Sequence, residues 1–429
     1  MSNENQPISV IGLGYVGLPL ACLFSRNHNV IGYEKDSEKV GKILSGEEVV
    51  KEPGLSELLS DRLNSGKLKL TSDKSLLGGA TVKFITVGTP YDLKTRQTDF
   101  SQLDSSIKDI SPYLNRGDVV ALKSTVPPGT TDGRVKLLIE SLGFKVPEEI
   151  GLVFSPERMV EGQAIHDFTS LPKIVGGSGE KSVDIIANIL TELGGRVVKV
   201  SSAVTAEMVK MIDNYSRFVF IGLTNEIALM SEKLGTDIYE LLNAAKEDYP
   251  RNSGLLKPGP GVGGSCLNKD PFILKSFMED AGLQLKFVEA AKEVNYSMAS
   301  HVVDITNSFS NGRKKVTIAG VAFKGDTNDT RFTTAFEIQK RLENSGYDTS
   351  FTDPYAVMDG VRIEPDLISA SKNSEILVLL TDHSAYKKLD LKILKESMGV
   401  DPMIMDTRGI IDRKEAEKMG FEYHGLGRL

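Results

Sequence analysis

The chain has 429 residues, of which 40% are apolar, with a formal net charge of −7 and two cysteines. This length allows roughly two to four domains, and the acidic balance argues against a nucleic-acid-binding protein, which usually has a basic face. Two cysteines cannot form a disulfide framework, so a reducing compartment is expected.

A membrane partner and a secreted location are not expected either. The longest apolar runs, such as LPLACLF, are far shorter than the roughly 20 residues that span a bilayer. The opening MSNENQP lacks the basic segment and cleavage site of a signal peptide. We therefore expect a soluble cytoplasmic protein.

The first 200 residues alternate short apolar runs with segments of helical periodicity. Strands are predicted at residues 8–12, 30–34, 83–88, 118–125, 151–155 and 173–177. Their β-branched content and weak apolar–polar alternation indicate strands buried on both faces, as in a parallel sheet. Because strands that alternate with helices form βαβ units, this region is predicted to be a doubly wound α/β domain.

The glycines of VIGLGYVGLPLA lie between the first strand and a helix, at Gly12, Gly14 and Gly17. In this G-x-G-x-x-G spacing the first glycine makes the turn, the second admits a pyrophosphate, and the third packs helix on strand. Glu34 ends the second strand, where an acid accepts ribose hydroxyls and repels the 2′-phosphate of NADP. We predict a Rossmann domain that binds NAD; the alternative is a glycine turn beside a capping acid.

Two further segments follow predicted strands of this domain. KSTVPPGT (123–130) contains Ser124 and Thr125, which either cap the next helix or hold a water molecule. SPERMVEG (155–162) contains Glu157 and Glu161. In open α/β sheets, groups beyond the carboxyl ends of the strands face the ligand crevice, so both segments are candidates for the site.

A long helix is predicted from about residue 203 to 234, because this stretch has no proline and its apolar residues recur at helical spacing. Gly235 is suited to end it. The helix is apolar on more than one face, so one face should pack on its own chain and another on a second copy. Further helix to about Ser310 indicates a helical middle domain.

Four polar residues lie near one face of this long helix: Glu207, Lys210, Asn214 and Arg217. A lysine and an amide one turn apart form a donor pair suited to an oxyanion. From the helix alone, a solvated stripe on an amphipathic helix is the simpler interpretation.

Cys266 lies in the glycine-rich segment GPGVGGSCLNKDP, residues 259–271. Glycine lets backbone or ligand approach closely, so this thiol is either a small filler or a nucleophile. Asp270 and Pro271 are predicted as the N-cap and first residue of the next helix. That helix start would favour the thiolate. Cys22, in an apolar helix, is expected in the core.

The α/β pattern returns at Gly312, with strands predicted at 314–324, 348–353, 375–382 and 403–409. The fold class is therefore α/β, with two Rossmann-like doubly wound domains joined by a helical domain that contains one long helix. The expected domain boundaries are 1–200, 201–311 and 312–429.

An ordered set of motifs covers nearly the whole chain: GLGYVGLPLA, EPGL (52–55), STVPPGT, SPERMVEG, EMVKMIDN, GPGVGGSCLNKD and GVAFKGDTNDTR (320–331). Together they resemble the UDP-sugar 6-dehydrogenase family, which includes UDP-glucose, UDP-N-acetylhexosamine and GDP-mannose dehydrogenases. The resemblance implies an NAD-binding domain, a central dimerisation domain, and a C-terminal domain that helps to bind the nucleotide sugar. It implies NAD as cofactor, no metal, and a homodimer or higher homo-oligomer.

The resemblance also implies a four-electron oxidation of the sugar C6 alcohol to the uronate, through a thiohemiacetal and a thioester on Cys266. Lys210 and Asn214 would stabilise oxyanions at C6. Asp270 and Thr125 would position or activate water, and Glu157 would assist acid–base steps.

The same resemblance implies residues that contact cofactor and substrate. For the cofactor these are Gly12, Gly14, Tyr15, Val16, Gly17, Glu34, Thr89, Thr125, Lys269 and Arg331. For the nucleotide sugar they are Glu157, Arg158, Glu161, Lys210, Asn214, Arg217, Arg251, Lys257, Gly263, Phe323 and Lys324. Arg251 could instead serve the neighbouring subunit's site.

The motifs that bear on the sugar resemble more than one branch of the family. LPKIVGG, AEMVK, Arg217 and KPGPGVGG resemble the UDP-N-acetylhexosamine branch. In contrast, GGSCLNKD resembles the UDP-glucose and GDP-mannose branches, and EGQAIHDF resembles the UDP-glucose branch. Ser265 stands where the N-acetylhexosamine branch usually has histidine. We favour UDP-N-acetylmannosamine, with UDP-glucose, UDP-N-acetylglucosamine and GDP-mannose as alternatives.

Two other classes of function remain open. A two-electron 3-hydroxyacid-type dehydrogenase also joins a Rossmann domain to a helical domain, but needs neither a loop cysteine nor a third α/β domain. A non-catalytic sensor of NAD or nucleotide sugars would bind the same ligands without forming acid.

Overall fold

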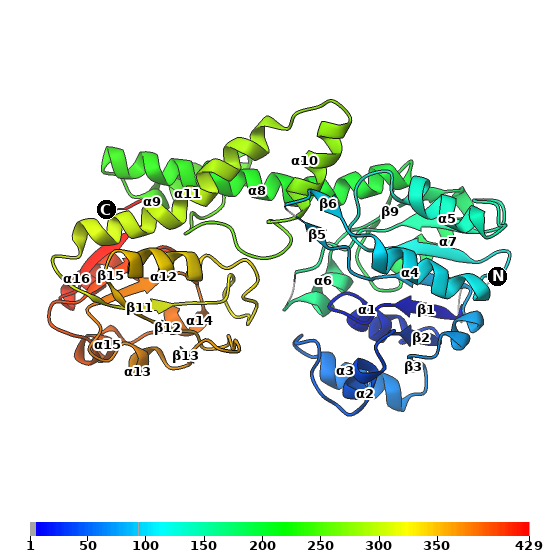
Figure 1. Ribbon diagram of the computed structural model, residues 1–429, viewed down its shortest axis with the longest axis horizontal. Coiled ribbons are helices and arrows are strands. Elements are labelled where there is room, and N and C mark those ends of the chain that lie inside the picture. Colours follow the sequence, from blue (N-terminus) through cyan, green and yellow to red (C-terminus); the bar gives the residue numbers. More distant parts are fainter. Residues whose placement is uncertain (1–5, 93, 161, 429) are drawn as a thin grey trace. The chain divides into compact units, whose positions relative to one another are not determined.

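The computed structural model describes residues 6–92, 94–160 and 162–428 (Figure 1). The chain divides into two compact units, one ending at Asp213 and the other beginning at Asn214. Helix α8 (Ala203–Leu234) runs through this division. Within the described ranges, we find no helix that combines the length and apolar character needed to cross a bilayer.

The first unit is built on one twisted sheet in the order β10-β9-β8-β7-β4-β1-β2-β3. Its strands are β1 (Ile8–Ile11), β2 (Val30–Tyr33), β3 (Leu68–Thr71), β4 (Val82–Ile85), β7 (Val119–Leu122), β8 (Gly151–Phe154), β9 (Lys173–Ser178) and β10 (Val197–Lys199). Strands β1, β4, β7 and β8 are buried along their whole length, which confirms the prediction of doubly buried strands. Strand β9 runs antiparallel to β8, and β3 and β10 were not predicted.

Helices cover both faces of this sheet (Figure 1). They are α1 (Gly17–Phe24), α2 (Ser37–Leu44), α3 (Leu55–Asn64), α4 (Ser101–Ile110), α5 (Lys136–Ser141), α6 (Ala164–Ser170) and α7 (Glu180–Thr191). Shorter elements are the 3-10 helices η1 (Lys74–Gly79) and η2 (Ser111–Tyr113) and the π-helix η3 (Thr131–Val135). Strands β5 (Tyr91–Asp92) and β6 (Gln97–Thr98) form a hairpin. Successive strand residues face opposite cores: Phe84 packs in one and Ile85 in the other. This alternation is why one sheet supports two helical layers.

The second unit contains a smaller, fully parallel sheet in the order β13-β12-β11-β14-β15-β16. Its strands are β11 (Lys315–Ala319), β12 (Asp348–Thr352), β13 (Ile363–Glu364), β14 (Ile376–Leu379), β15 (Met403–Asp406) and β16 (Glu422–Gly425). The order matches that of β3-β2-β1-β4-β7-β8 in the first unit, so the prediction of two doubly wound sheets is confirmed. The first strand is shorter than predicted because Gly320, with φ of +99°, turns the chain.

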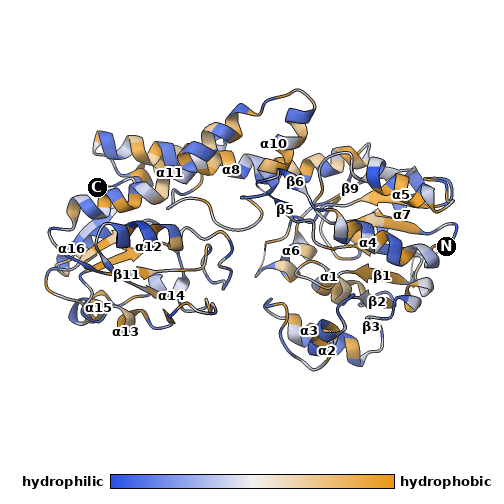
Figure 2. Cartoon of the chain, in the orientation of Figure 1, coloured by the Kyte–Doolittle hydropathy of each residue, from blue (hydrophilic) through white to orange (hydrophobic). Residues whose placement is uncertain are grey.

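Long helices precede this second sheet, as predicted. The helices of the unit, besides its part of α8, are α9 (Ile238–Lys246), α10 (Asp270–Asp280), α11 (Lys286–Phe309), α12 (Ala335–Asn344), α13 (Leu367–Ala370), α14 (Ser384–Lys387), α15 (Leu391–Ser397) and α16 (Arg413–Lys418), with a 3-10 turn η4 (Pro250–Asn252). The chain leaves α8 through Gly235, whose φ of +68° suits a helix end. Hydrophobic and hydrophilic residues alternate along α8, whereas the strands of both sheets are mainly hydrophobic (Figure 2).

Candidate active site

The glycine-rich turn after β1 has the form that a dinucleotide requires. Gly12 has φ of +94°, a region that residues with a side chain rarely adopt. A Cβ on Gly17 would overlap the carbonyl oxygen of Gly12, so this glycine is needed for packing. A Cβ on Gly14 would meet nothing within 4 Å, so the space beside Gly14 is open on the side where a pyrophosphate would approach. Tyr15 and Val16 follow as half-buried residues that lead into α1.

Glu34 lies directly after β2 and reaches back to the glycine-rich turn. Its carboxylate accepts a hydrogen bond of 3.1 Å from the backbone amide of Leu13 and an ion pair of 2.9 Å from Lys39. The acid therefore lies beside the predicted dinucleotide turn, as the motif requires. Lys35, the next residue, is turned toward Ser105.

Thr89 and Thr125 lie at the carboxyl ends of β4 and β7, which are neighbours in the sheet. The hydroxyl of Thr89 donates to the carbonyl oxygen of Thr125 and joins the two loops. Ser124 donates to the carbonyl oxygen of Val87 at 2.6 Å. Two roles were open for Ser124, a helix cap or a water ligand; its hydroxyl instead bridges two strand ends.

Glu157 follows β8 and has both carboxylate oxygens engaged. One oxygen accepts hydrogen bonds from the backbone amides of Arg158 and Met159, at 2.9 and 3.0 Å. The other forms an ion pair of 3.2 Å with the buried Lys123, from the segment after β7. These contacts fix the orientation of the carboxylate.

Arg158 is held by α8, since its guanidinium contacts both carboxylate oxygens of Asp213 at 2.6 and 3.3 Å. This pairing connects the segment after β8 to the helix that carries Lys210. Glu161 was also predicted to bind substrate, but it lies outside the described residues.

The four polar residues predicted along α8 do not have equal environments. Lys210 and Asn214 are half-buried and Arg217 is exposed, whereas Glu207 is fully buried. The Glu207 carboxylate accepts hydrogen bonds from the Gly129–Thr131 turn. A solvated stripe is therefore wrong for Glu207, which is inside the first unit.

In the second unit, Cys266 lies in the turn immediately before α10 and its residue is exposed. The carbonyl oxygen of Cys266 accepts from the backbone amides of Lys269 and Asp270, at 3.2 and 2.8 Å. Asn268 closes the other side of the loop by donating to the carbonyl oxygens of Val262 and Gly264. The backbone around the thiol is therefore held by its own hydrogen bonds.

Asp270 does not cap α10 as predicted. It is the first residue of the helix. Its buried carboxylate accepts a hydrogen bond of 2.6 Å from the side-chain amide of Asn214 on α8. Its other oxygen, Oδ1, is buried and has no hydrogen-bond partner among the described residues, although Lys269 Nζ lies 3.6 Å away. The structure thus brings Asn214, Asp270 and the turn of Cys266 together.

The glycine-rich segment packs against the loop after β11. A Cβ on Gly263 or on Gly264 would collide with the side chain of Phe323. The backbone amide of Gly264 donates a hydrogen bond of 2.9 Å to the carbonyl oxygen of Arg331. Only glycine allows this approach, so the thiol loop and the loop that carries Phe323 form one surface of the second unit.

Several predicted cations occur in the second unit. Arg251 and Lys257 are exposed and Lys324 is half-buried. Arg331 is exposed and forms an ion pair of 2.6 Å with Asp329. The predicted cations thus lie in the segment before the thiol loop and in the loop after β11.

Sequence reasoning missed Arg408, which follows β15 and approaches Gly259 in the glycine-rich segment. Its guanidinium lies 3.5 Å from Asp382. Burial would raise the pKa of Asp382, but the charges of Arg408, Lys387 and Lys257 outweigh it and lower that pKa. The position of Arg408 just beyond a parallel strand was the available signal.

Both sheets have a similar glycine turn after their first strand, but only the first sheet leaves open space beside that turn. Gly320 repeats the geometry of Gly12, and Asp353 after β12 accepts from the amide of Val321 as Glu34 accepts from Leu13. Asp353, however, is fully buried and also accepts from His383. The position that would receive a ribose in the second sheet is therefore filled by protein.

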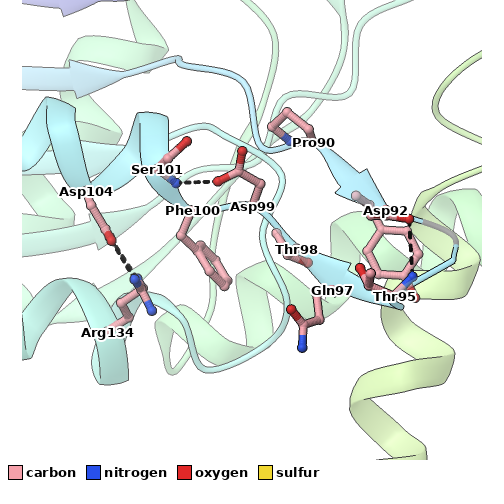
Figure 3. Close-up of a pocket in the computed structure, with 11 residues that line it drawn as sticks. Pro90, Asp92, Thr95, Gln97, Thr98, Asp99, Phe100, Ser101, Asp104 and Arg134 are labelled. Carbon is pink, nitrogen blue, oxygen red and sulfur yellow. Dashed lines mark hydrogen bonds and ion pairs between the residues drawn. The ribbon is translucent and has the colours of Figure 1, made fainter.

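A hollow of about 760 Å³ lies beside the β5–β6 hairpin (Figure 3). Its charged side chains hold one another or the loop backbone: Arg134 contacts Asp104, and Asp99 accepts from the amide of Ser101. We assign this hollow no ligand.

The decisive comparison concerns three family models that match in succession. The NAD-binding domain of the UDP-glucose/GDP-mannose dehydrogenase family matches residues 6–193, the central domain matches residues 204–297, and the UDP-binding domain matches residues 317–413. The chain belongs to the UDP-glucose/GDP-mannose dehydrogenase family. It is therefore an NAD-dependent oxidoreductase, and the open approach beside Gly14 fits that cofactor.

Individual members of this dehydrogenase family match almost from end to end. A UDP-N-acetyl-D-mannosamine dehydrogenase from Methanocaldococcus jannaschii is 33% identical over 98% of this chain and 96% of its own length. A UDP-glucose 6-dehydrogenase from Bacillus subtilis is 31% identical over 98% of this chain and 93% of its own length. A solved structure of UDP-D-ManNAc dehydrogenase from Pyrococcus horikoshii has a TM-score of 0.88 and 31% identity, covering 98% of this chain and 99% of that one.

Proposed function

We propose that the protein oxidises the C6 alcohol of UDP-N-acetyl-D-mannosamine to the carboxylate in two successive steps that use NAD. The observation that carries this proposal is Cys266 in a backbone-bonded turn of the second unit, with Asp270 and Asn214 hydrogen-bonded beside it. A two-electron dehydrogenase needs no such thiol. Because the chain belongs to the UDP-glucose/GDP-mannose dehydrogenase family, we do not propose a 3-hydroxyacid-type dehydrogenase.

The thiol explains how an alcohol can lose four electrons in one site. The alcohol first loses a hydride and a proton and becomes an aldehyde. The Cys266 thiolate adds to that aldehyde, and the resulting tetrahedral carbon can lose a second hydride, which leaves a thioester. Water then hydrolyses the thioester to the carboxylate and regenerates the thiol. Bound NAD supplies the hydride acceptor in each oxidation.

Charge develops on oxygen at C6 during these steps. In our proposal Lys210 and Asn214 donate to that oxygen, and Lys210 also assists the removal of the hydroxyl proton. They come from successive turns of α8, which suits donors to one oxygen.

Water has two candidate ligands in this scheme. The unpartnered Oδ1 of Asp270 would accept a hydrogen bond from the hydrolytic water, since buried polar atoms seldom lack partners. Thr125 would position water from the first unit, and Glu157, fixed by Lys123, would assist the proton transfers.

The nucleotide sugar carries two phosphates, which require cations. Lys257, Lys324 and Arg408 occur in the segments that adjoin the glycine-rich loop, and guanidinium and ammonium groups are the usual partners of phosphate. We assign residues 1–200 to the NAD domain, 201–311 to the central domain and 312–429 to the domain that helps to bind the nucleotide.

The choice of sugar follows the relatives. The M. jannaschii relative, at 33% identity, and the P. horikoshii structure are named for UDP-N-acetylmannosamine, whereas the B. subtilis relative, at 31% identity, is named for UDP-glucose. Ser265 before the thiol remains the residue that favours UDP-glucose, which is the second candidate.

The deciding experiment measures NADH formation with UDP-N-acetylmannosamine, UDP-N-acetylglucosamine, UDP-N-acetylgalactosamine, UDP-glucose and GDP-mannose. We expect the highest kcat/KM with UDP-N-acetylmannosamine and two NADH for each sugar oxidised. One NADH with a stable aldehyde would refute the four-electron scheme. A preference for UDP-glucose would make the protein a UDP-glucose 6-dehydrogenase that uses the same two-step chemistry.

A Cys266→Ser variant separates the enzyme from a sensor. It should bind the nucleotide sugar with nearly unchanged affinity, yet form no net acid. Undiminished acid formation by this variant would remove the thiol from the mechanism. Because the mechanism needs a reduced thiol, we place the protein in the cytoplasm, where thiols stay reduced.

A homodimer is also part of this proposal. Helix α8 carries Phe220, Leu223, Met230 and Leu234 as exposed apolar residues at helical spacing, so they form one stripe. A second copy would cover that stripe. We expect light scattering to give the dimer mass for the wild type and a lower mass for Leu223→Asp; a wild-type monomer would contradict this assignment.

A further inference from the structure

Glu207 is a buried carboxylate that the proposed mechanism does not use. It is fully buried in the first unit and accepts three hydrogen bonds from one turn. The donors are the backbone amide of Gly129 at 2.5 Å, the backbone amide of Thr131 at 2.8 Å and the hydroxyl of Thr131 at 2.6 Å. A fully buried carboxylate is rare and costly unless its partners compensate, so this cluster needs an explanation.

The turn that Glu207 holds is directly connected to Thr125. Pro127 and Pro128 stand between them, and proline fixes its φ, so the connecting segment is stiff. Thr130 tightens it further, because its hydroxyl and its amide both donate to the carbonyl oxygen of Pro127. A movement of the turn is therefore transmitted to Thr125.

Helix α8 is the other element that Glu207 connects. Lys210 lies three residues further along α8, near the same face of the helix. We propose that Glu207 is a positioning residue: its carboxylate fastens the Gly129–Thr131 turn to α8 and thereby fixes Thr125 relative to Lys210. This inference rests on the proposed function, in which Thr125 and Lys210 act at one reacting centre.

The charge of Glu207 responds to its surroundings near neutral pH. Burial raises its pKa to about 7, against the opposing effect of the hydrogen bonds from Thr131 and Gly129. Asp132 in the π-helix η3 raises the pKa of Glu207 further through its negative charge. On α8 itself, the cation nearest in sequence is Lys210. Protonation would convert one carboxylate oxygen into a hydroxyl, which cannot serve both amides of the turn as an ionised group does.

The ionised form is therefore the one that holds Thr125, and kcat should fall as the pH drops through about 7. Two neighbouring substitutions should move this acid limb of the pH profile in opposite directions. Thr131→Val removes a hydrogen bond to the ionised carboxylate and should shift the midpoint of the acid limb to higher pH by about 0.5–1 unit. Asp132→Asn removes a repulsive charge and should move it down by a few tenths of a unit.

Glu207→Gln tests the same residue directly. It cannot ionise, so the acid limb near pH 7 should disappear and kcat should fall about 10-fold or more, with KM for the nucleotide sugar changed much less. The matched control is Glu375→Gln. Glu375 also accepts from two backbone amides, those of Lys314 and Lys315, but it lies at the amino end of β14. This control should keep the wild-type pH profile.

A purely structural role predicts a different outcome. In that case Glu207→Gln, Thr131→Val and Asp132→Asn would lower the melting temperature while the pH dependence of kcat stayed that of the wild type. This result would overturn the proposal.

Hydrogen exchange gives a test that does not depend on turnover. In the wild type, the amides of Gly129 and Thr131 should lose protection, after correction for intrinsic rates, when the pH falls from 8 to 6. In Glu207→Gln their protection should not change with pH. Wild-type amides with constant protection would refute the inference even if the dehydrogenase activity is found. Absence of activity with every nucleotide sugar, alongside the expected exchange, would instead refute the proposed function.

Discussion

Oδ2 of Asp270 accepts a hydrogen bond of 2.6 Å from the side-chain amide of Asn214, a residue 56 positions earlier in the chain. The bond joins the first turn of α10 to the middle of α8 and brings a side-chain amide beside a carboxylate. The remaining oxygen of Asp270 is buried and has no hydrogen-bond partner among the described residues, with the Lys269 ammonium 3.6 Å from it. A carboxylate in this setting can hold a water molecule and accept its proton.

The first prediction concerns that carboxylate. Asp270→Asn keeps an oxygen that can accept from Asn214 but removes the group that takes a proton. We expect kcat to fall by about 10²–10⁴-fold, as for the loss of a general base. Stability should not fall, because burying an amide costs less than burying a carboxylate.

The control for this prediction is Asp237→Asn, which changes an acid that caps the start of α9. Asparagine caps a helix as well as aspartate does, so this variant should retain both activity and stability. Steady-state kinetics and urea unfolding measure both variants. Wild-type kcat in Asp270→Asn would exclude Asp270 from proton transfer.

The second prediction separates the two thiols. Cys22 is fully buried, and burial raises the pKa of its thiol to about 12, whereas Cys266 is exposed. Because the thiolate is the reactive form, iodoacetamide should modify Cys266 and leave Cys22 intact in the folded protein. Peptide mass spectrometry measures both sites, and unfolding in urea should make both reactive. Equal modification rates in the folded protein would contradict the assigned environments.

The third prediction distinguishes cofactor binding from folding in the glycine-rich turn. A Cβ on Gly14 meets no protein atom within 4 Å but would occupy the approach of the pyrophosphate. Gly14→Ala should therefore raise the Kd for NAD about 10-fold or more and change the free energy of unfolding by less than about 0.5 kcal/mol. Calorimetric titration with NAD and urea unfolding measure the two quantities.

Gly17→Ala is the matched comparison. Its Cβ would overlap the Gly12 carbonyl oxygen and contact the hydroxyl of Thr86 at 2.5 Å. We expect a loss of about 1–3 kcal/mol in the free energy of unfolding, as for overpacked sites. If both variants lose stability equally, the separation of roles within the motif is wrong.

The fourth prediction concerns acid stability. Burial alone would raise the pKa of Asp353, but hydrogen bonds from His383 and from the amides of Ala322 and Tyr355 outweigh it and hold the pKa at about 2. Nδ1 of His383 accepts from the amide of Asp326, so Nε2 donates to Asp353. The stabilisation is present above pH 4 and is lost as the pH falls toward 2.

The measurement is urea unfolding at pH 6 and at pH 3. Since the pKa of Asp353 lies almost two units below its ordinary value, and pH 3 lies between the two values, the wild type should lose about 1 kcal/mol more than Asp353→Asn over this range. Asp390→Asn, at the start of α15, should behave like the wild type. An Asp353→Asn variant with the wild-type dependence on pH would refute this assignment.

The sequence by itself determined the features that depend on neighbouring residues. The spacing of Gly12, Gly14 and Gly17 predicted the turn after β1, and the periodicity from residue 203 to 234 predicted α8 with its observed bounds. Turn geometry and helix periodicity are local properties, so a single chain segment suffices to identify them. The thiol loop was recognisable for the same reason, since its four glycines lie within six consecutive residues, 259–264.

Only the tertiary structure decided how distant segments meet. The contact of Asp270 with Asn214, the approach of Arg408 to Gly259 and the burial of Glu207 join residues tens to more than a hundred positions apart. Helical spacing places Glu207 and Lys210 near one face, but it cannot show that packing buries one and leaves the other half-exposed. Which oxygen finds a partner depends on the whole chain, because each buried polar group is satisfied by whichever element packs against it.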